Sequence, residues 1–247
     1  MTNKNNRICL VIGGNGIVGH EICLSMKKNG WNVISLSRNK PSSERMINGI
    51  NYFKGDATQE NELNKIIEQI ESSIGPIQSL INCACIRPMK NYFEDEIEKF
   101  EESIVANSLS LFVPARIIGI RMAKRNKGSI INVSSIYGMR GPKMNIYRES
   151  DFETEPDYAY TKSGSIGLTK YLASYFSQSG VRVNSVVLGG IENNQPENFK
   201  KFYNDRVPLG RMCNLSEIGG VFIFLSSNSA SYITGSIICV DGGWTAT

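Results

Sequence analysis

Residues 8–19 read ICLVIGGNGIVG, an apolar run followed directly by a turn that contains four glycines. The apolar run predicts a buried β-strand, and the residues from His20 onward predict a helix. Glycine lets the backbone turn tightly and approach a diphosphate, while the N-terminus of the following helix offers free N–H groups and partial positive charge. The spacing differs from the common Gly-x-Gly-x-x-Gly, so a plain tight turn is the alternative. The residues expected at a dinucleotide are Gly13, Asn15, Gly16, Ile17 and Gly19.

The same alternation of short apolar runs and longer amphipathic segments continues along the chain. Segment 63–74 places Leu and Ile at helical spacing among Glu and Lys, and a helix is expected over 215–226, capped by Asn214 or Ser216. Alternating strands and helices imply a parallel sheet covered on both faces. We therefore predict an α/β fold, a doubly wound parallel sheet in one domain over residues 1–247. The other expected strands are 33–37, 52–54, 80–83, 130–133, 183–188 and 237–240.

Composition excludes several other classes of protein. The 247 residues are 41% hydrophobic and 20% charged, as in ordinary globular chains and unlike disordered or coiled-coil sequences. The formal net charge is +4 and the basic residues are scattered, so no nucleic-acid partner is expected. No apolar run approaches the roughly 18 residues of a membrane span, so no membrane partner is expected. Six cysteines without metal-site spacing are interpreted as reduced thiols, which predicts a cytoplasmic protein.

The chain has one histidine, His20, directly after the glycine turn. One histidine cannot complete a Ser-His-Asp triad and also hold a metal ion, so the hydrolase and zinc-enzyme hypotheses lack parts. We therefore predict no metal site.

The end of the second expected strand bears on the choice of cofactor. An acidic residue about 20 positions after the glycine turn would bind the ribose 2′-OH of NAD, but residues 35–39 read SLSRN and contain no carboxylate. Arg38, beside Ser37, can pair with the 2′-phosphate of NADP, so NADP(H) is favoured over NAD(H). The alternative is that Arg38 is a solvated residue that stacks on the adenine. Asp56, with Ala57 beside it, is expected either to bind the adenine amino group or to cap the next helix.

A tyrosine–lysine pair suggests acid–base chemistry. Of the ten tyrosines, only Tyr158 has a lysine four residues on, Lys162. On a helix over 158–172 the two side chains share one face, with Cβ atoms about 5–6 Å apart. A nearby ammonium favours the phenolate, which makes the hydroxyl a usable acid or base near neutrality. Ser135 ends an expected strand, at the sheet edge where open parallel sheets bind ligands, and is placed to hydrogen-bond a carbonyl or alcohol oxygen.

With these residues, the chain resembles the short-chain dehydrogenases/reductases over nearly its whole length. Residues 132–135 (NVSS) resemble the serine motif of that family, and 158–164 (YAYTKSG) resemble its catalytic helix. Residues 82–85 (NCAC) are similar to the N-N-A-G motif after its fourth strand. Further similar segments near the C-terminus are 208–212, 232–235 and 240–243.

The resemblance implies a Rossmann sheet of about seven strands, as in the compact single-domain branch, and a homo-oligomer, a tetramer or dimer. It implies that Tyr158 exchanges a proton with the substrate oxygen and that Ser135 stabilises the carbonyl. Lys162 would assist the tyrosine and hold the nicotinamide ribose, and Asn107 would order a relay water, while hydride transfer belongs to the cofactor. The further cofactor residues that it implies are Asn82, Ala84, Gly189 and Ile191, with Tyr158 and Lys162.

Several features depart from the compact pattern. The glycine spacing resembles the extended, sugar-nucleotide branch, and Cys83 and Cys85 replace residues of N-N-A-G. Leu188 stands where proline is usual. Residues 139–157, a stretch without clear period, form an insertion between Ser135 and Tyr158 that is expected to cover the substrate and carry specificity.

These features predict an NADP(H)-dependent oxidoreductase that interconverts an alcohol and a carbonyl on a small-molecule substrate. A weaker similarity of the segment from Gly189 to Pro208 to reductases of flagellin-modification and nonulosonic-acid pathways favours a sugar-derived substrate of a surface-glycan pathway. A phosphate on it would be bound by Arg140, Lys143 and Arg148, which alternatively only balance acidic neighbours on a wet loop. The other candidates are a 3-oxoacyl-type or generic carbonyl reductase and a non-catalytic NAD(P) sensor.

Overall fold

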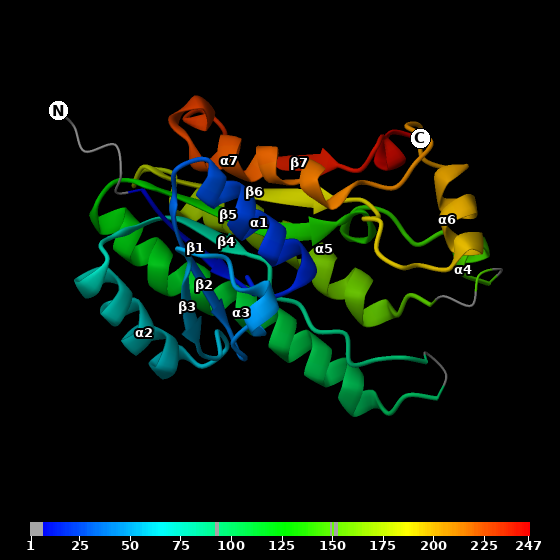
Figure 1. Ribbon diagram of the computed structural model, residues 1–247, viewed down its shortest axis with the longest axis horizontal. Helices are drawn as coiled ribbons and strands as arrows, with labels where there is room; N and C mark the ends of the chain where they lie inside the picture. The colour runs from blue at the N-terminus through cyan, green and yellow to red at the C-terminus, as the bar shows by residue number, and fades with distance from the viewer. Residues whose placement is uncertain (1–6, 92–93, 149, 151–152) are drawn as a thin grey trace.

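The computed structural model describes residues 7–91, 94–148, 150 and 153–247. Within them, seven parallel strands form one sheet in the order β3-β2-β1-β4-β5-β6-β7 (Figure 1). All five residues of β1 are buried, because helices cover both faces of the sheet and leave no solvated side. The strands are β1 (Ile8–Ile12), β2 (Asn32–Ser37), β3 (Asn51–Lys54), β4 (Ile77–Asn82), β5 (Gly128–Ser135), β6 (Val181–Leu188) and β7 (Ile237–Val240).

The strand order reverses beside β1. The chain lays β2 and then β3 on one side of β1, crosses back, and adds β4 on the other side. Parallel pairing places Ile12, at the end of β1, opposite Leu36 of β2 and Asn82 of β4. Two connections therefore leave this point in opposite directions, and an open α/β sheet forms its ligand crevice at such a point.

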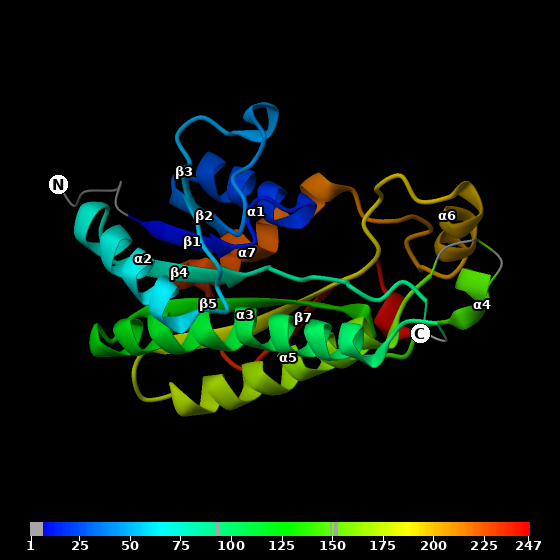
Figure 2. The same cartoon turned by 90° about the horizontal axis from the view of Figure 1, so that it is seen from below.

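Two helices, α1 (Ile17–Lys28) and α7 (Gly219–Ser226), cover one face of the sheet, and α2 (Glu60–Ser73), α3 (Ile97–Lys124) and α5 (Pro156–Tyr175) cover the other (Figure 2). Each face has its own apolar core. A third buried cluster contains Tyr137, Tyr147, Phe199, Tyr203 and Trp244. It involves the short helices α4 (Met144–Arg148) and α6 (Glu197–Asn204), which Figure 1 shows together at one end of the molecule.

The predicted fold is confirmed, whereas several predicted boundaries were wrong. The fourth strand runs over Ile77–Asn82 rather than 80–83. The expected helix over 215–226 is a 3₁₀ turn, Leu215–Glu217, followed by α7, and Asn214 forms a capping box with Glu217. Helix α5 begins at Pro156, a residue favoured in a first helical turn.

The insertion at 139–157 is more ordered than its sequence indicates. It contains α4, and its residues Ile146 and Tyr147 are buried in the third cluster. A helix of five residues is too short to produce a recognisable period, so the sequence pattern missed it. Residues 149, 151 and 152 of the insertion lie outside the described residues.

Helix α3 corrects the expectation that no segment suits a membrane. Its 28 residues are long and apolar enough to cross one, by length and composition only. Half of its most apolar stretch is buried inside the protein. The helix packs on β4, β5 and α5, as the core helix of a folded domain does.

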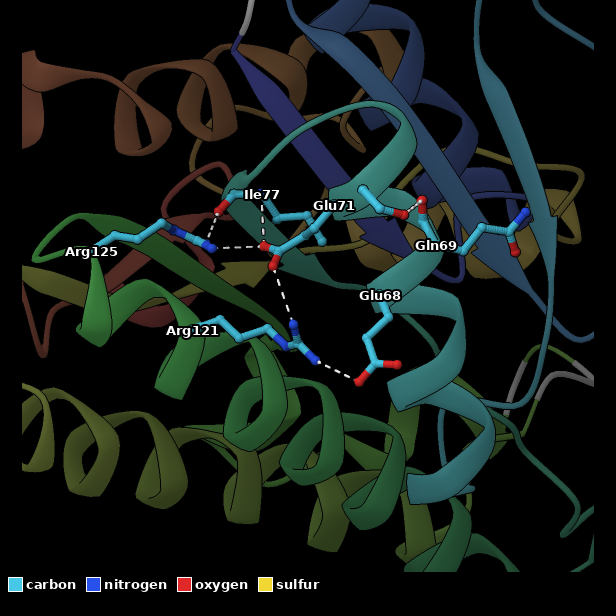
Figure 3. Close-up of polar contacts among 7 residues, drawn as sticks. Glu68, Gln69, Glu71, Ile77, Arg121 and Arg125 are labelled. Carbon is cyan, nitrogen blue, oxygen red and sulfur yellow. Dashed lines mark hydrogen bonds and ion pairs between the residues drawn. The ribbon is translucent and has the colours of Figure 1, made fainter.

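Polar contacts fasten α2 to α3 and to the start of β4 (Figure 3). Glu71 accepts hydrogen bonds from the backbone N–H of Ile77 at 3.2 Å and from Arg125 at 2.9 Å. Its other oxygen pairs with Arg121 at 3.4 Å. Arg125 also donates to the carbonyl of Ile77 at 3.0 Å, so Glu71 joins three segments of the chain.

We expect Glu71→Ala to lower the free energy of unfolding by about 2 kcal/mol, because it leaves the backbone N–H of Ile77 without its acceptor and removes one partner from each of two arginines. Glu68→Ala is the matched control, since Glu68 makes one 3.4 Å ion pair with Arg121 and its side chain is 67% exposed, against 15% for Glu71. Loss of such a surface pair is worth about 0–1 kcal/mol. Urea unfolding measures both variants, and equal destabilisation by the two would contradict the role given to Glu71.

Candidate active site

The glycine turn between β1 and α1 is closely packed on the end of β4. Gly13 has φ +80°, and a Cβ there would lie 2.7 Å from the backbone N of Ala84. A Cβ on Gly19 would lie 2.2 Å from the carbonyl oxygen of Gly13, which brings the first turn of α1 against the loop. Gly16 is the N-cap residue of α1 and has no side chain, so the first-turn N–H groups stay open to an anion.

Asn15 ties this turn to the end of β2. Its side-chain oxygen accepts a hydrogen bond from Ser35 at 2.8 Å, and its amide donates to the carbonyl of Asn39. Its backbone N–H donates to the Ser37 hydroxyl at 3.3 Å. These bonds hold the turn against the end of β2.

A cleft of about 520 Å³ opens beside the turn. Arg38 lies exposed in its wall and makes no ion pair with any residue that the structure describes. Asp56 accepts hydrogen bonds from the N–H and hydroxyl of Thr58 through one oxygen, at 2.9 and 2.8 Å. The predicted cofactor residues that line this cleft are Gly13, Asn15, Gly16, Ser37, Arg38, Asp56, Ala57 and Ala84.

A second cleft of about 530 Å³ shares Cys83 and Cys85 with the first, so the two form one elongated site. Ser135, Tyr158 and Lys162 line it, together with the other predicted cofactor residues Ile17, Gly189 and Ile191. The Ser135 hydroxyl accepts a hydrogen bond from the N–H of Tyr137 at 3.2 Å, which fixes the strand end.

Lys162 is held in place beside Tyr158. It is buried, its Nζ donates to the carbonyl of Val133 at 3.0 Å, and it lies 5.6 Å from the centre of the Tyr158 ring. Burial lowers the pKa of this ammonium, but Cys85, Tyr158 and Cys83 outweigh that effect, so the pKa is raised above its ordinary value. Lys162 is therefore charged at neutral pH, next to the tyrosine ring.

Asn107 connects the loop after β4 to the start of α5. Its side-chain oxygen accepts from the N–H of Ile86 at 2.8 Å, and its amide donates to the carbonyl of Ile86 at 3.0 Å and to Ser103 at 3.1 Å. Ser103 then donates to the buried Asp157 at 2.5 Å, the residue before Tyr158. Both amide hydrogens of Asn107 are used in this network.

Two of the predicted cofactor residues do not line either cleft. Asn82 is 3% exposed, and its amide donates to Asn132 at 2.9 Å. Asn132 donates in turn to Thr169 at 2.9 Å, so this row of side chains joins β4, β5 and α5. Gly19 is buried under the turn, and its absent side chain permits close packing.

The cysteines that depart from N-N-A-G stand where the two clefts meet. Burial raises the pKa of the Cys83 thiol to about 12, so this residue stays a neutral thiol at neutral pH. Cys85 is exposed.

Sequence reasoning missed several residues of the second cleft. The guanidinium carbon of Arg87 lies 3.7 Å from the centre of the Tyr158 ring, a cation–π contact. Tyr137 and Tyr147 line the same cleft, and their hydroxyls are hydrogen-bonded to each other. The signal for Arg87 was its place just after β4, at the carboxyl edge of the sheet. The aromatic residues carried no comparable signal.

The insertion does not supply its expected cations to this cleft. Arg140 donates to the carbonyl of Thr245 at 3.0 Å and lies outside the cleft wall, as does Lys143. The side chain of Arg148 lies outside the described part of the chain. Instead, the insertion contributes Tyr147, Glu153 and Thr154 to the cleft.

Comparison with known proteins places this site in a family. The family model of enoyl-(acyl carrier protein) reductases matches residues 14–245. Nodulation protein G of Azospirillum brasilense is 30% identical over 97% of this chain and 98% of its own. The 3-oxoacyl-[acyl-carrier-protein] reductase of Aquifex aeolicus is 31% identical over 96% of each chain.

A solved structure agrees with these relatives. The short chain dehydrogenase of Leptospira borgpetersenii serovar Hardjo-bovis, with bound NAD+, superposes with a TM-score of 0.90 at 33% identity. The match covers 98% of this chain and 93% of that one. On the fold, on the two-part cleft and on these matches, the chain belongs to the short-chain dehydrogenases/reductases, the NAD(P)-dependent oxidoreductases.

Proposed function

We propose that this enzyme interconverts an alcohol and a carbonyl with NADP(H), and that Tyr158 is its acid–base residue. The observation that supports this most is the fixed Tyr158–Lys162 pair at one end of an elongated cleft. The other end of that cleft carries the glycine turn and helix N-terminus that suit a dinucleotide. The residues present therefore fit the cofactor of the family.

Three residues share the catalytic work in this proposal. Tyr158 passes its proton to the substrate oxygen during reduction and takes it back during oxidation. The charged Lys162 stabilises the phenolate and holds the nicotinamide ribose, while the Ser135 hydroxyl donates to the same substrate oxygen. When bound, the cofactor supplies or accepts the hydride.

Asn107 has a positioning role in this proposal. Both hydrogens of its side-chain amide are already donated. A relay water would therefore have to hydrogen-bond to its backbone carbonyl, which also accepts from the Ser110 hydroxyl at 3.2 Å. The side chain itself holds Ile86 and so keeps the wall between the two clefts in place.

Arg38 supports NADP(H) over NAD(H). Its guanidinium forms no ion pair within the described residues and could pair with a 2′-phosphate, and it lies in the cleft wall just after β2, in a segment, residues 35–39, that contains no carboxylate. We expect NADPH to bind about 10- to 100-fold more tightly than NADH, and Arg38→Ala to remove that difference. Fluorescence titration with both cofactors measures it, with the exposed Lys40→Ala as control. Tighter binding of NADH by the unaltered protein would contradict the assignment of Arg38.

The proposed substrate is a small polar carbonyl compound that the insertion at 139–157 helps to enclose. The cleft contains the hydroxyls of Tyr137 and Tyr147 and the charges of Arg87 and Glu153, which suit polar groups. A sugar-derived substrate fits this lining. A 3-oxoacyl substrate is the second candidate, because a 31% identical relative carries that name. A 3-oxoacyl substrate carries an apolar chain and needs an apolar cleft wall, whereas a sugar-derived substrate needs polar partners.

We also propose that the enzyme is a cytoplasmic homo-oligomer. Phe112 and Ile120 on α3 and Tyr171 and Tyr175 on α5 are exposed, and Figure 2 shows these two helices side by side on one face. A second copy of the chain would cover this apolar surface.

A further inference from the structure

Among the described residues of the second cleft, Arg87 is an exposed cation that forms no ion pair. Among the described residues that line it, Arg87 and Lys162 are positively charged and Glu153 is negatively charged. Lys162 is buried and donates to Val133, whereas Arg87 is exposed. None of the ion pairs formed within the described residues involves Arg87. An anion entering this cleft would therefore meet Arg87.

The position of Arg87 relative to the chemistry is fixed from two sides. Its guanidinium carbon lies 3.7 Å from the centre of the Tyr158 ring, so it stands beside the proposed acid–base group. Its neighbour Ile86 is hydrogen-bonded through both backbone groups to Asn107. That asparagine is joined through Ser103 to Asp157, which precedes Tyr158. The loop of Arg87 and the helix of Tyr158 are thus one connected unit.

A guanidinium has a planar set of donors that matches a carboxylate, and stacking on an aromatic ring leaves the edge of that plane open. A substrate whose carboxylate is bound by this edge would place its reacting oxygen at Tyr158 if the two groups are separated by only a few bonds. Glu153 is exposed at the cleft and opposes anion binding. It makes no ion pair with Arg87, so it leaves the guanidinium available.

We propose that Arg87 determines specificity by binding a carboxylate of the substrate, close to the carbon that is oxidised or reduced. The substrate class is then a small oxo or hydroxy acid, which includes sugar acids. This inference rests on the proposed function, since it takes Tyr158 as the group that meets the reacting oxygen.

The test compares acetoacetate with its methyl ester, which has the same oxo group and no charge. Binding of each probe is measured by calorimetry to protein saturated with whichever of NADP+ or NAD+ binds more tightly. Steady-state reduction of each probe gives a second readout. Variants are Arg87→Gln, Arg87→Lys and, as matched control, Arg140→Gln, which removes an arginine of the insertion that lies outside the cleft.

We expect the unaltered protein to bind acetoacetate about 10- to 100-fold more tightly than the ester, as two charge-assisted hydrogen bonds allow. Arg87→Gln should remove this preference and leave affinity for the ester within about threefold. Arg87→Lys should keep part of the preference, because lysine keeps the positive charge but lacks the paired N–H donors with which a guanidinium binds both oxygens of a carboxylate. Arg140→Gln should change nothing.

Equal affinity for acid and ester, or a preference that survives Arg87→Gln, would overturn the proposal. Binding of neither probe to the cofactor-loaded protein would overturn it as well, because the free guanidinium would then not attract a carboxylate. Failure of the proposed function has a different signature: neither oxidised cofactor would bind, or Tyr158→Phe would leave reduction unchanged while the acid preference persisted.

Discussion

Replacing Tyr158 by phenylalanine is expected to reduce kcat by about 10³-fold, within the range that general acid–base catalysis contributes. The change removes one hydroxyl and keeps the ring, whose centre lies 3.7 Å from the Arg87 guanidinium carbon and 5.6 Å from Lys162 Nζ. Cofactor affinity should therefore change less than about threefold. Stopped-flow reduction and cofactor titration of the same preparation separate the two quantities.

Tyr160→Phe is the matched control. Tyr160 lies two residues further along α5, is 60% exposed and contacts the ring of Phe100 outside the cleft. It should retain full activity. A Tyr158→Phe enzyme that keeps more than a tenth of its turnover would remove Tyr158 from the acid–base role and favour a different proton donor.

The second large effect is expected at the glycine turn. In Gly13→Ala, an L-residue at φ +80° and a Cβ 2.7 Å from backbone atoms of Ala84 should together lower the free energy of unfolding by roughly 3 kcal/mol. Since the turn is also the proposed diphosphate site, cofactor affinity should fall with it. Thermal unfolding with and without NADPH measures both effects.

Gly16→Ala separates folding from binding. Gly16 has φ −70°, which alanine accepts, and its Cβ would lie 3.4 Å from the carbonyl of Gly13. Stability should change by less than about 1 kcal/mol. The added methyl would obstruct the approach of a diphosphate, and NADPH affinity should fall about 10- to 100-fold. Gly141→Ala, with open space around its Cβ, is the control. Unchanged NADPH affinity in Gly16→Ala would contradict the assignment of the turn.

The strand pattern of this fold was predictable because buried parallel strands are continuous apolar runs. The start of β4 was not, since it contains Gln78 and Ser79. Ser79 is buried and hydrogen-bonded to Ser226 at 2.7 Å, so a polar side chain is accommodated inside the sheet by a partner 147 positions away. The residues around Ser79 in the sequence do not indicate that Ser226 will be its partner.

In the candidate site, too, some contacts could be predicted from the sequence and others could not. Tyr158 and Lys162 are one helical turn apart, so their proximity follows from the sequence. The contact of Arg87 with Tyr158 depends on how the loop after β4 returns over α5, which the sequence does not encode locally. The cations of the insertion were expected at the substrate because the insertion was expected to cover it. In the folded protein Arg140 turns instead to the carbonyl of Thr245.

The hydrogen-bonded line from Ile86 through Asn107 and Ser103 to Asp157 has a consequence for how this enzyme can evolve. It joins the loop of Arg87 to the helix of Tyr158 without passing through residues 139–155. Substitutions, insertions and deletions in that stretch can therefore reshape the far wall of the cleft while the proton donor keeps its place. Descendants of this chain can acquire new substrates by drift in one surface segment, and selection need not rebuild the chemistry each time.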